Sequence, residues 1–141
     1  MDNKALNYLS LARKGGLAEL GEEPVGGAAR AGKAYAILVA ADASDHTWRR
    51  AKSFAAGTEQ QCVRLPWSKD ELGQAIGRDS LAIAAITDAA MALALVSSLP
   101  QNESYKPALE VLTQKAAKAK KRQAEAKAHQ RNLRRGKKNV K

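Results

Sequence analysis

The chain has 141 residues, enough for one ordinary domain with a segment left over, and its 24 Lys and Arg against 14 Asp and Glu give a formal charge of +10. Residues 1–101 hold 11 basic and 11 acidic side chains, whereas residues 102–141 hold 13 and 3. The longest apolar stretch, Ala89–Val96, is far shorter than the roughly 20 residues that span a bilayer, and we expect no secretory signal. The single cysteine cannot form an internal disulfide, and no Cys/His cluster has zinc spacing. We expect a soluble, cytoplasmic protein with a polyanionic partner, nucleic acid before membrane.

Apolar spacing predicts the first elements of the chain. A helix over 4–14 places its leucines near one face and ends at a glycine pair. A second helix, Glu22–Ala31, has Pro24 in its first turn, where proline is tolerated, and ends at Gly32. The uninterrupted apolar run Ala34–Ala40 is typical of a strand that is covered on both faces.

Helices and strands then alternate up to Pro100. The expected elements are a helix over 45–56, a strand over 61–65, a short helix over 68–77, a strand over 81–86 and a helix to residue 99. Their helix starts carry capping residues, namely Ser44 or Asp45, a capping box that begins at Ser68, and Thr87 or Asp88. This alternation indicates an α/β domain over residues 1–101, a three-layer α/β/α sandwich around a small mixed sheet of three or four strands.

Residues 102–141 form a basic tail rich in Ala, Lys and Gln. Leu109, Val111 and Leu112 give it some amphipathic content, and good helix formers follow. Because a helix here is basic almost all round, with no apolar stripe after Leu112, we expect a fluctuating helix that orders mainly against an anion. The cations repel one another, and phosphates relieve that repulsion through counterion release. The tail is therefore expected to follow a nucleic-acid backbone rather than distinguish bases.

Motifs for catalysis are missing. The stretch from Gly27 to Lys33 has the spacing of a phosphate-binding loop, but it ends a helix and precedes a strand, the reverse of the order that such a loop needs. His46 and His129 are the only histidines, and neither belongs to a catalytic constellation. The carboxylate pairs occupy helix starts, where acidic residues favour the helix dipole. We expect a protein that is not an enzyme and that uses no cofactor or metal.

Two features of the body leave alternatives open. Gly26 and Gly27 stand in a helix interior, where each costs about 1 kcal/mol relative to alanine. Either the helix packs tightly on the sheet, or a bulky ligand approaches its backbone. Trp48, beside Arg49 and Arg50, is suited to stacking on a base, but packing against the sheet is the favoured interpretation.

Residues 6–99 resemble a known family. The segments that carry the resemblance are LNYLSLARKGGLAELGEE at 6–23, ARAGKAYAILVAADAS at 29–44, KDELGQAIG at 69–77 and ITD at 86–88. Together they resemble the YlxQ branch, the bacterial relatives of the kink-turn-binding ribosomal proteins (the L-seven-Ae type). The resemblance implies an α/β/α sandwich that binds structured RNA without catalysis.

The resemblance also implies where RNA binds, at the start of the second helix (Gly21–Gly27) and in the loop Gly77–Leu81. Family members that bind kink-turns carry an Asn–Glu pair and a Lys three residues after that Glu. In this sequence those positions are Glu23, Pro24 and Gly27, so the lysine that contacts phosphate is missing. This departure argues against tight kink-turn recognition, and the basic tail can restore affinity that the body has lost.

The expected function is that of a non-catalytic RNA-binding protein of the ribosome or of its assembly. Its expected nucleic-acid-binding residues are Arg13, Lys14, Gly21, Glu22, Glu23, Gly27, Arg30, Lys33, Arg78 and Ser80 in the body, and Lys118, Lys120, Lys121, Arg122, Arg131, Arg134, Arg135, Lys137 and Lys138 in the tail. Expected partners are structured RNA, ribosomal RNA first, and ribosomal proteins or translation factors, with the chain a monomer in isolation. Three alternatives stay open: a protein-interaction module of the translation or transcription machinery, an accessory domain of an RNA-modifying enzyme, and a DNA-binding protein.

Overall fold

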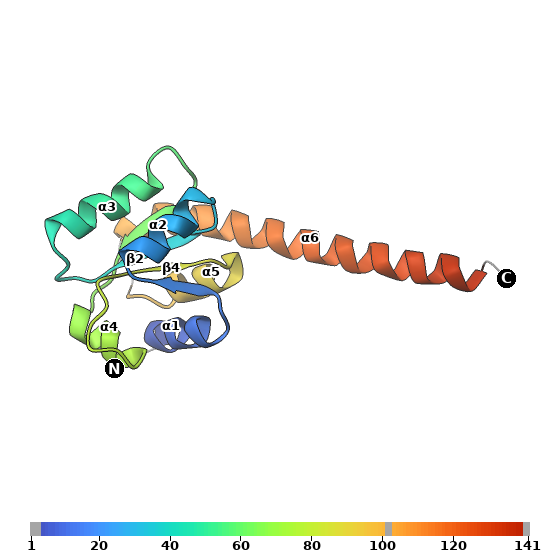
Figure 1. Ribbon diagram of the computed structural model, residues 1–141. Coiled ribbons are helices and arrows are strands. Elements are labelled where there is room, and N and C mark those ends of the chain that lie inside the picture. Colours follow the sequence, from blue (N-terminus) through green and yellow to red (C-terminus); the bar gives the residue numbers. More distant parts are fainter. Residues whose placement is uncertain (1–3, 101–102, 140–141) are drawn as a thin grey trace.

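The computed structural model describes the backbone of residues 4–100 and 103–139, with side chains up to Asn132. Its elements are, in chain order, α1 (Lys4–Lys14), β1 (Ala18–Leu20), α2 (Glu22–Arg30), β2 (Ala36–Val39), α3 (Asp45–Ala55), β3 (Gln61–Arg64), α4 (Lys69–Ala75), β4 (Ile83–Ile86), α5 (Ala89–Ser97), the 3₁₀ turn η1 (Glu103–Tyr105) and α6 (Lys106–Asn139). Helices α2 and α3 lie on one side of the sheet, and α1, α4 and α5 lie on the other (Figure 1). The expected α/β/α sandwich is confirmed.

The sheet has four strands in the order β1-β4-β2-β3. Strands β2 and β3 are parallel, and the other two pairs are antiparallel, so the sheet is mixed as expected. Every residue of β2 and β4 is buried, because helices cover both faces of these central strands. Strand β1 was not predicted: it has three residues at the sheet edge, too few to show an alternating pattern.

The helix starts follow the predicted capping residues. Of the alternatives left open, Ser44 caps α3 and Asp88 caps α5. At α4, the backbone N–H of Glu71 donates to the Ser68 hydroxyl (3.2 Å) and the backbone N–H of Ser68 donates to the Glu71 carboxylate (3.1 Å). This reciprocal pair is the predicted capping box.

The first turns of α6 belong to the hydrophobic core. Tyr105, Ala108 and Leu112 are buried, and α6 packs along α5 and against β3. The Tyr105 hydroxyl donates a 2.7 Å hydrogen bond to the backbone oxygen of Arg64, and burial raises the pKa of this phenol. The packed part of the chain therefore continues past residue 101 to the first turns of α6.

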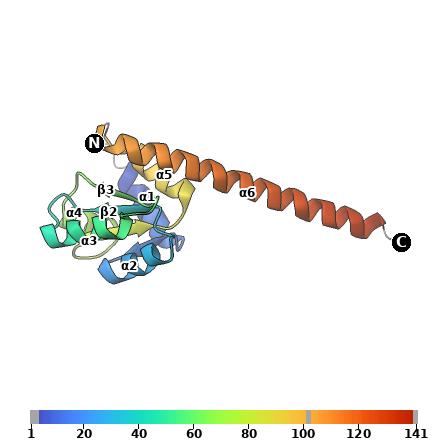
Figure 2. The same ribbon diagram turned by 90° about the horizontal axis from the view of Figure 1, so that it is seen from above.

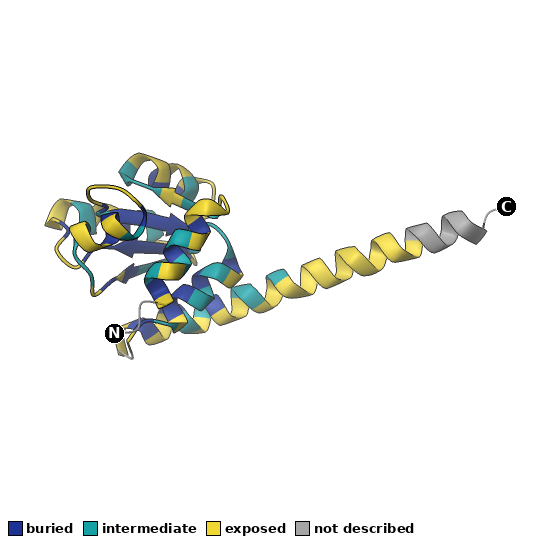
Figure 3. Cartoon of the chain, turned by 90° about the horizontal axis from the view of Figure 1, so that it is seen from below, coloured by how far each residue is buried: buried dark blue, intermediate teal, exposed yellow. Residues whose placement is uncertain are grey.

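Beyond these turns α6 leaves the body. All residues from Lys120 to Asn132 are exposed, and the helix projects away from the sandwich as a single rod (Figures 2 and 3). From the sequence we expect a fluctuating helix that orders mainly against an anion, whereas the structure has one continuous helix. The physical reason is that starting a helix is the unfavourable step, and the docked turns supply a formed start from which Ala, Lys and Gln extend it.

Candidate nucleic-acid interface

The pairing of β1 with β4 gives the sheet two distinct ends. At one end, the backbone N–H of Gly21 donates to the oxygen of Ile83 (3.0 Å). At the other, the N–H of Thr87 donates to the oxygen of Leu17 (2.8 Å), and Asp88, the next residue, lines a groove with α6. We call these the Gly21 end and the α6 end. The expected binding residues are divided between them.

The Gly21 end contains the start of α2. Gly21 has a φ of +97°, a conformation that side-chain-bearing residues rarely adopt, and it begins the helix without a side-chain cap. Glu22 and Glu23 occupy the first turn, where carboxylates interact favourably with the helix dipole. The helix start is therefore held by its backbone, and it carries negative rather than positive side chains.

The loop at residues 77–81 is held in place by α4. The backbone N–H of Arg78 donates to the oxygen of Gly73 (2.8 Å), and that of Leu81 donates to the oxygen of Lys69 (2.9 Å). A β-carbon on Gly73 would lie 2.6 Å from the Cα of Ser80, so only glycine admits this close approach. Arg78 and Ser80 are exposed on the resulting loop.

Gly73 is a site-supporting residue that sequence reasoning missed. The signal was a glycine inside the capped KDELGQAIG helix, where glycine costs helix stability unless another segment needs the space. The loop also joins the Gly21 end directly, because it leads into Ile83, which accepts the Gly21 hydrogen bond. The structure thus brings Gly21, Glu22, Glu23, Arg78 and Ser80 to one end of the sheet.

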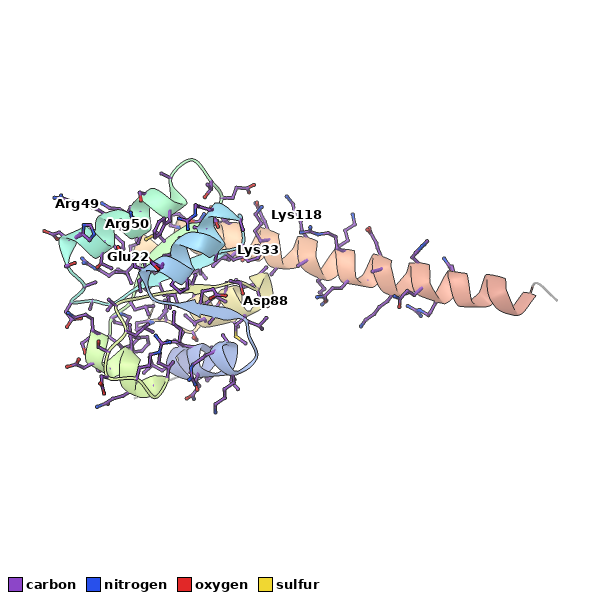
Figure 4. The ribbon with its side chains drawn as sticks, viewed as in Figure 1. Glu22, Lys33, Arg49, Arg50, Asp88 and Lys118 are labelled. Atoms are coloured by element: carbon purple, nitrogen blue, oxygen red, sulfur yellow. The ribbon has the colours of Figure 1, made fainter. Side chains whose placement is uncertain are left out.

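Helix α3 adds two cations to the Gly21 end, Arg49 and Arg50, which in the sequence stand out only as neighbours of Trp48. The Nε of Arg50 donates to a carboxylate oxygen of Glu22 at 3.2 Å, and the Nε2 of His46 lies 3.8 Å from the same oxygen. Figure 4 shows Arg49 and Arg50 on α3 above Glu22. The pair is exposed and adds little stability, and it engages one of the two Glu22 carboxylate oxygens.

The two helix-interior glycines of α2 have different explanations. Gly26 is buried, and a β-carbon there would lie 3.1 Å from the Phe54 ring of α3, so close packing explains this glycine. The packing is against α3 rather than against the sheet. Gly27 is exposed and has nothing within 4 Å of an added β-carbon. Packing therefore does not explain Gly27.

The α6 end holds four other expected residues of the body, all of them cations. Arg13 and Lys14 end α1 shortly before Leu17, and Arg30 and Lys33 lie just before β2, whose first residue pairs with the end of β4. Lys118, Lys120, Lys121, Arg122 and Arg131 are exposed on α6. The side chains of Arg134, Arg135, Lys137 and Lys138 lie outside the described residues. Figure 4 shows Lys33 and Lys118 on the side where α6 leaves the body, away from Glu22 and Arg50.

Trp48 packs against the hydrophobic core, in agreement with the favoured interpretation that it is a packing residue. It is partly buried against the core, and the guanidinium of Arg64 and the ammonium of Lys52 lie 4.8 Å and 5.5 Å from its ring centre. Cys62 lies nearby in β3; burial raises the pKa of its thiol to about 11, although Lys52 and Arg64 lower it. This cysteine is a neutral thiol at neutral pH, a poor nucleophile.

Metal sites and membrane spans can be assessed over the part of the chain that the structure describes. Among residues 4–100 and 103–132, no group of three or more His, Cys, Asp or Glu side chains is placed to hold a metal ion. Within the same described part, no helix combines the length and the apolar character that a membrane span needs.

A four-stranded mixed sheet between two helical layers defines the fold class, and solved structures share it. A protein with unknown function from Bacillus halodurans C is 24% identical with a TM-score of 0.63, covering 68% of this chain and 96% of that one. The Giardia lamblia 15.5kD RNA binding protein is 17% identical with a TM-score of 0.53, covering 79% and 83%. No family model and no curated protein matches the chain. At these identities the likeness establishes the fold.

Proposed function

We propose that the chain is a non-catalytic RNA-binding protein of the YlxQ-like branch, acting on the ribosome or in its assembly. The observation that carries this proposal is the free half of α6. Its exposed residues from 120 to 132 include five cations and one carboxylate: Lys120, Lys121, Arg122, Lys127, Arg131 and Glu125. Such a rod is stabilised when phosphates replace its counterions.

RNA rather than DNA is favoured because the fold is shared with a protein described as RNA-binding. The sequence resemblance points the same way and assigns recognition to the Gly21 end. There the fixed loop presents Arg78 and Ser80, and α3 contributes Arg49 and Arg50. In this proposal the loop and α3 provide the cations that the start of α2 lacks, and Gly27 lets an RNA backbone approach α2 closely.

The second candidate is a protein-interaction module that has lost specific RNA recognition. Two observations favour it: Gly27 stands where kink-turn binders are expected to carry lysine, and Arg50 occupies an oxygen of Glu22. The net charge of +10 favours the RNA proposal, because the charge lies on an exposed helix with no protein surface against it in the described part of the chain.

Binding to a kink-turn RNA and to a matched straight duplex at increasing salt distinguishes the candidates. The variants are the full chain and a truncation that ends at Lys120, which keeps the buried turns of α6 and removes most of its exposed cations. The slope of log K against log salt should fall by about 0.7–0.9 for each phosphate that the truncated chain no longer neutralises. Arg78→Gln removes an exposed charge inside the loop, and Lys69→Gln removes a half-buried charge outside the loop as its control.

A preference for the bent RNA that survives high salt and is abolished in Arg78→Gln supports recognition at the Gly21 end. Equal, salt-sensitive binding of both RNAs that disappears in the truncation leaves α6 as a polyanion anchor and favours a protein partner for the body. No binding of either RNA to the full chain refutes the proposal.

A further inference from the structure

A polar groove at the α6 end lies outside the family's RNA-binding surface. It has a volume of about 460 Å³ and lies between the end of α2, the turn before β3 and the first half of α6. The lining residues that matter are Arg30, Tyr35, Glu59, Gln60, Lys115 and Arg122. We call it the Tyr35 groove. A volume of this size lies in the range of small-ligand sites.

The turn that forms one wall of the groove is locked by Gln60. This residue is buried, with 8% of its surface exposed, and its Oε1 accepts a hydrogen bond from the backbone N–H of Ala34 (2.9 Å). Its Nε2 donates to the backbone oxygen of Ala29 (3.2 Å) and to the hydroxyl of Thr58 (3.3 Å). Gln60 therefore ties the end of α2, the approach to β2 and the turn together, and the wall is formed before any ligand arrives.

The α6 wall is attached by an ion pair. The ammonium of Lys115 lies 3.1 Å from a carboxylate oxygen of Glu59, and the Lys115 side chain is only 24% exposed. Arg30 and Arg122 are exposed at the groove. Since Glu59 is the one acidic residue of the described lining against three cations, the groove is net positive and suited to a phosphate.

Tyr35 gives the groove an aromatic surface. The residue is half-buried against the core, and its hydroxyl makes no hydrogen bond to the part of the chain that the structure describes. An aromatic ring beside cations in a preformed groove is the arrangement by which proteins hold unpaired nucleotides, with the base stacked on the ring and the backbone on the positive charges.

Positive side chains continue outside the groove, where they can contact the backbone of a strand longer than one nucleotide. Lys33 precedes Tyr35 by two residues, Lys118 lies one turn beyond Lys115, and both are exposed at the same end of the molecule (Figure 4). From Arg122 the cations continue along the free part of α6. A free mononucleotide would contact the groove alone, whereas a strand would also reach the cations outside it.

We propose that the Tyr35 groove binds one unpaired nucleotide of a single-stranded RNA segment whose backbone continues along α6. This inference rests on the proposed RNA-binding function and adds a second contact at the end of the sheet opposite the loop 77–81. The base stacks on Tyr35, and its phosphates lie between Arg30 and Arg122.

Fluorescence anisotropy with a labelled decauridine RNA tests the proposal, with the kink-turn RNA measured in parallel. Tyr35→Leu removes the ring and should weaken decauridine binding roughly 5- to 150-fold, whereas Tyr35→Phe should stay within about twofold of the full chain. Arg122→Gln should weaken it more than Arg131→Gln, which removes the same charge from α6 outside the groove. Circular dichroism establishes that each variant is folded.

Decauridine binding that is unchanged in Tyr35→Leu, or equally weakened in Arg122→Gln and Arg131→Gln, overturns the groove proposal while leaving kink-turn binding as separate evidence for RNA function. If neither decauridine nor the kink-turn RNA binds the full chain, both the proposed function and the groove proposal are refuted. Binding of polyglutamate that is abolished in Tyr35→Leu would assign the groove to an acidic protein instead. If Tyr35→Leu does not fold, the comparison of the two arginine variants decides.

Discussion

Replacing Gly73 by alanine tests how the loop at residues 77–81 is held. An added β-carbon would lie 2.6 Å from the Cα and 2.7 Å from the N of Ser80, and 2.8 Å from the backbone oxygen of Arg78. All three are backbone atoms, so relief requires the loop to move by about 0.8 Å to reach an ordinary contact of about 3.4 Å. Side-chain repacking alone cannot supply that space.

The expected change in unfolding free energy follows from three terms. Overpacking costs about 1–3 kcal/mol. Weakening the hydrogen bond from Arg78 to Gly73 costs about 1 kcal/mol, and the better helix propensity of alanine returns about the same. Gly73→Ala should therefore destabilise the fold by about 1–3 kcal/mol, which lowers Tm by about 4–12 °C at roughly 4 °C per kcal/mol.

Gly27→Ala is the matched control, because Gly27 is also in a helix interior and has open space around its α-carbon. It should stabilise the protein by about 0.5–1 kcal/mol. Thermal unfolding followed by circular dichroism measures both variants, and RNA binding is compared at the same temperature. The reasoning is refuted if Gly73→Ala unfolds at or above the wild-type temperature, or if Gly27→Ala loses as much stability as Gly73→Ala.

Three further predictions concern packing and titration. Leu112→Ala should cost about 2–5 kcal/mol, whereas truncation at Lys120 should leave Tm nearly unchanged, because only the first turns of α6 are buried; equal losses would contradict this division. Tyr105→Phe should reduce the unfolding free energy by about 0.5–1.5 kcal/mol in chemical denaturation, because its hydrogen bond to Arg64 is removed, and no reduction would mean that water replaces it. The Cys62 thiol, with a pKa of about 11 against 9.0, should be about 100-fold less ionised at neutral pH than an exposed thiol and correspondingly slow toward a disulfide reagent. Because the unfolded thiol loses its proton first, stability should fall as pH rises from 9 to 11 by an amount that is absent in Cys62→Ala.

The central strands and helix starts were predictable because their signals are local. An apolar run is sufficient to predict a strand such as Ala36–Val39 that is covered on both faces, and Ser68 with Glu71 specifies a helix start within four residues. Strand β1 has no such signal, because its pairing is supplied by β4 rather than by its own pattern. Docking of α6 was also visible in principle, since Tyr105, Ala108 and Leu112 follow helical spacing on one face.

The division of the expected binding residues between two ends could not be predicted, because it depends on strand register. Glu22 meets Arg50 across 28 residues, and Gln60 meets Ala29 across 31. Neither contact has a sequence pattern of its own. The need for glycine at position 73 was equally hidden. It arises from Ser80, seven residues away, on a loop whose path depends on the sheet.

The separation of the two ends limits which RNA can use both. Strand β2 has four residues, about 13 Å, and α6 from Lys120 to Asn139 adds about 30 Å in the direction away from Glu22 (Figure 1). A compact motif bound at the Gly21 end therefore reaches the far end of α6 only if a flanking segment of about 40 Å follows it. Truncation at Lys120 should weaken binding to the motif with a long flank more than binding to a minimal kink-turn, because the flank forms its second contact at high effective concentration. Equal weakening of both RNAs would mean that α6 folds back over the bound motif.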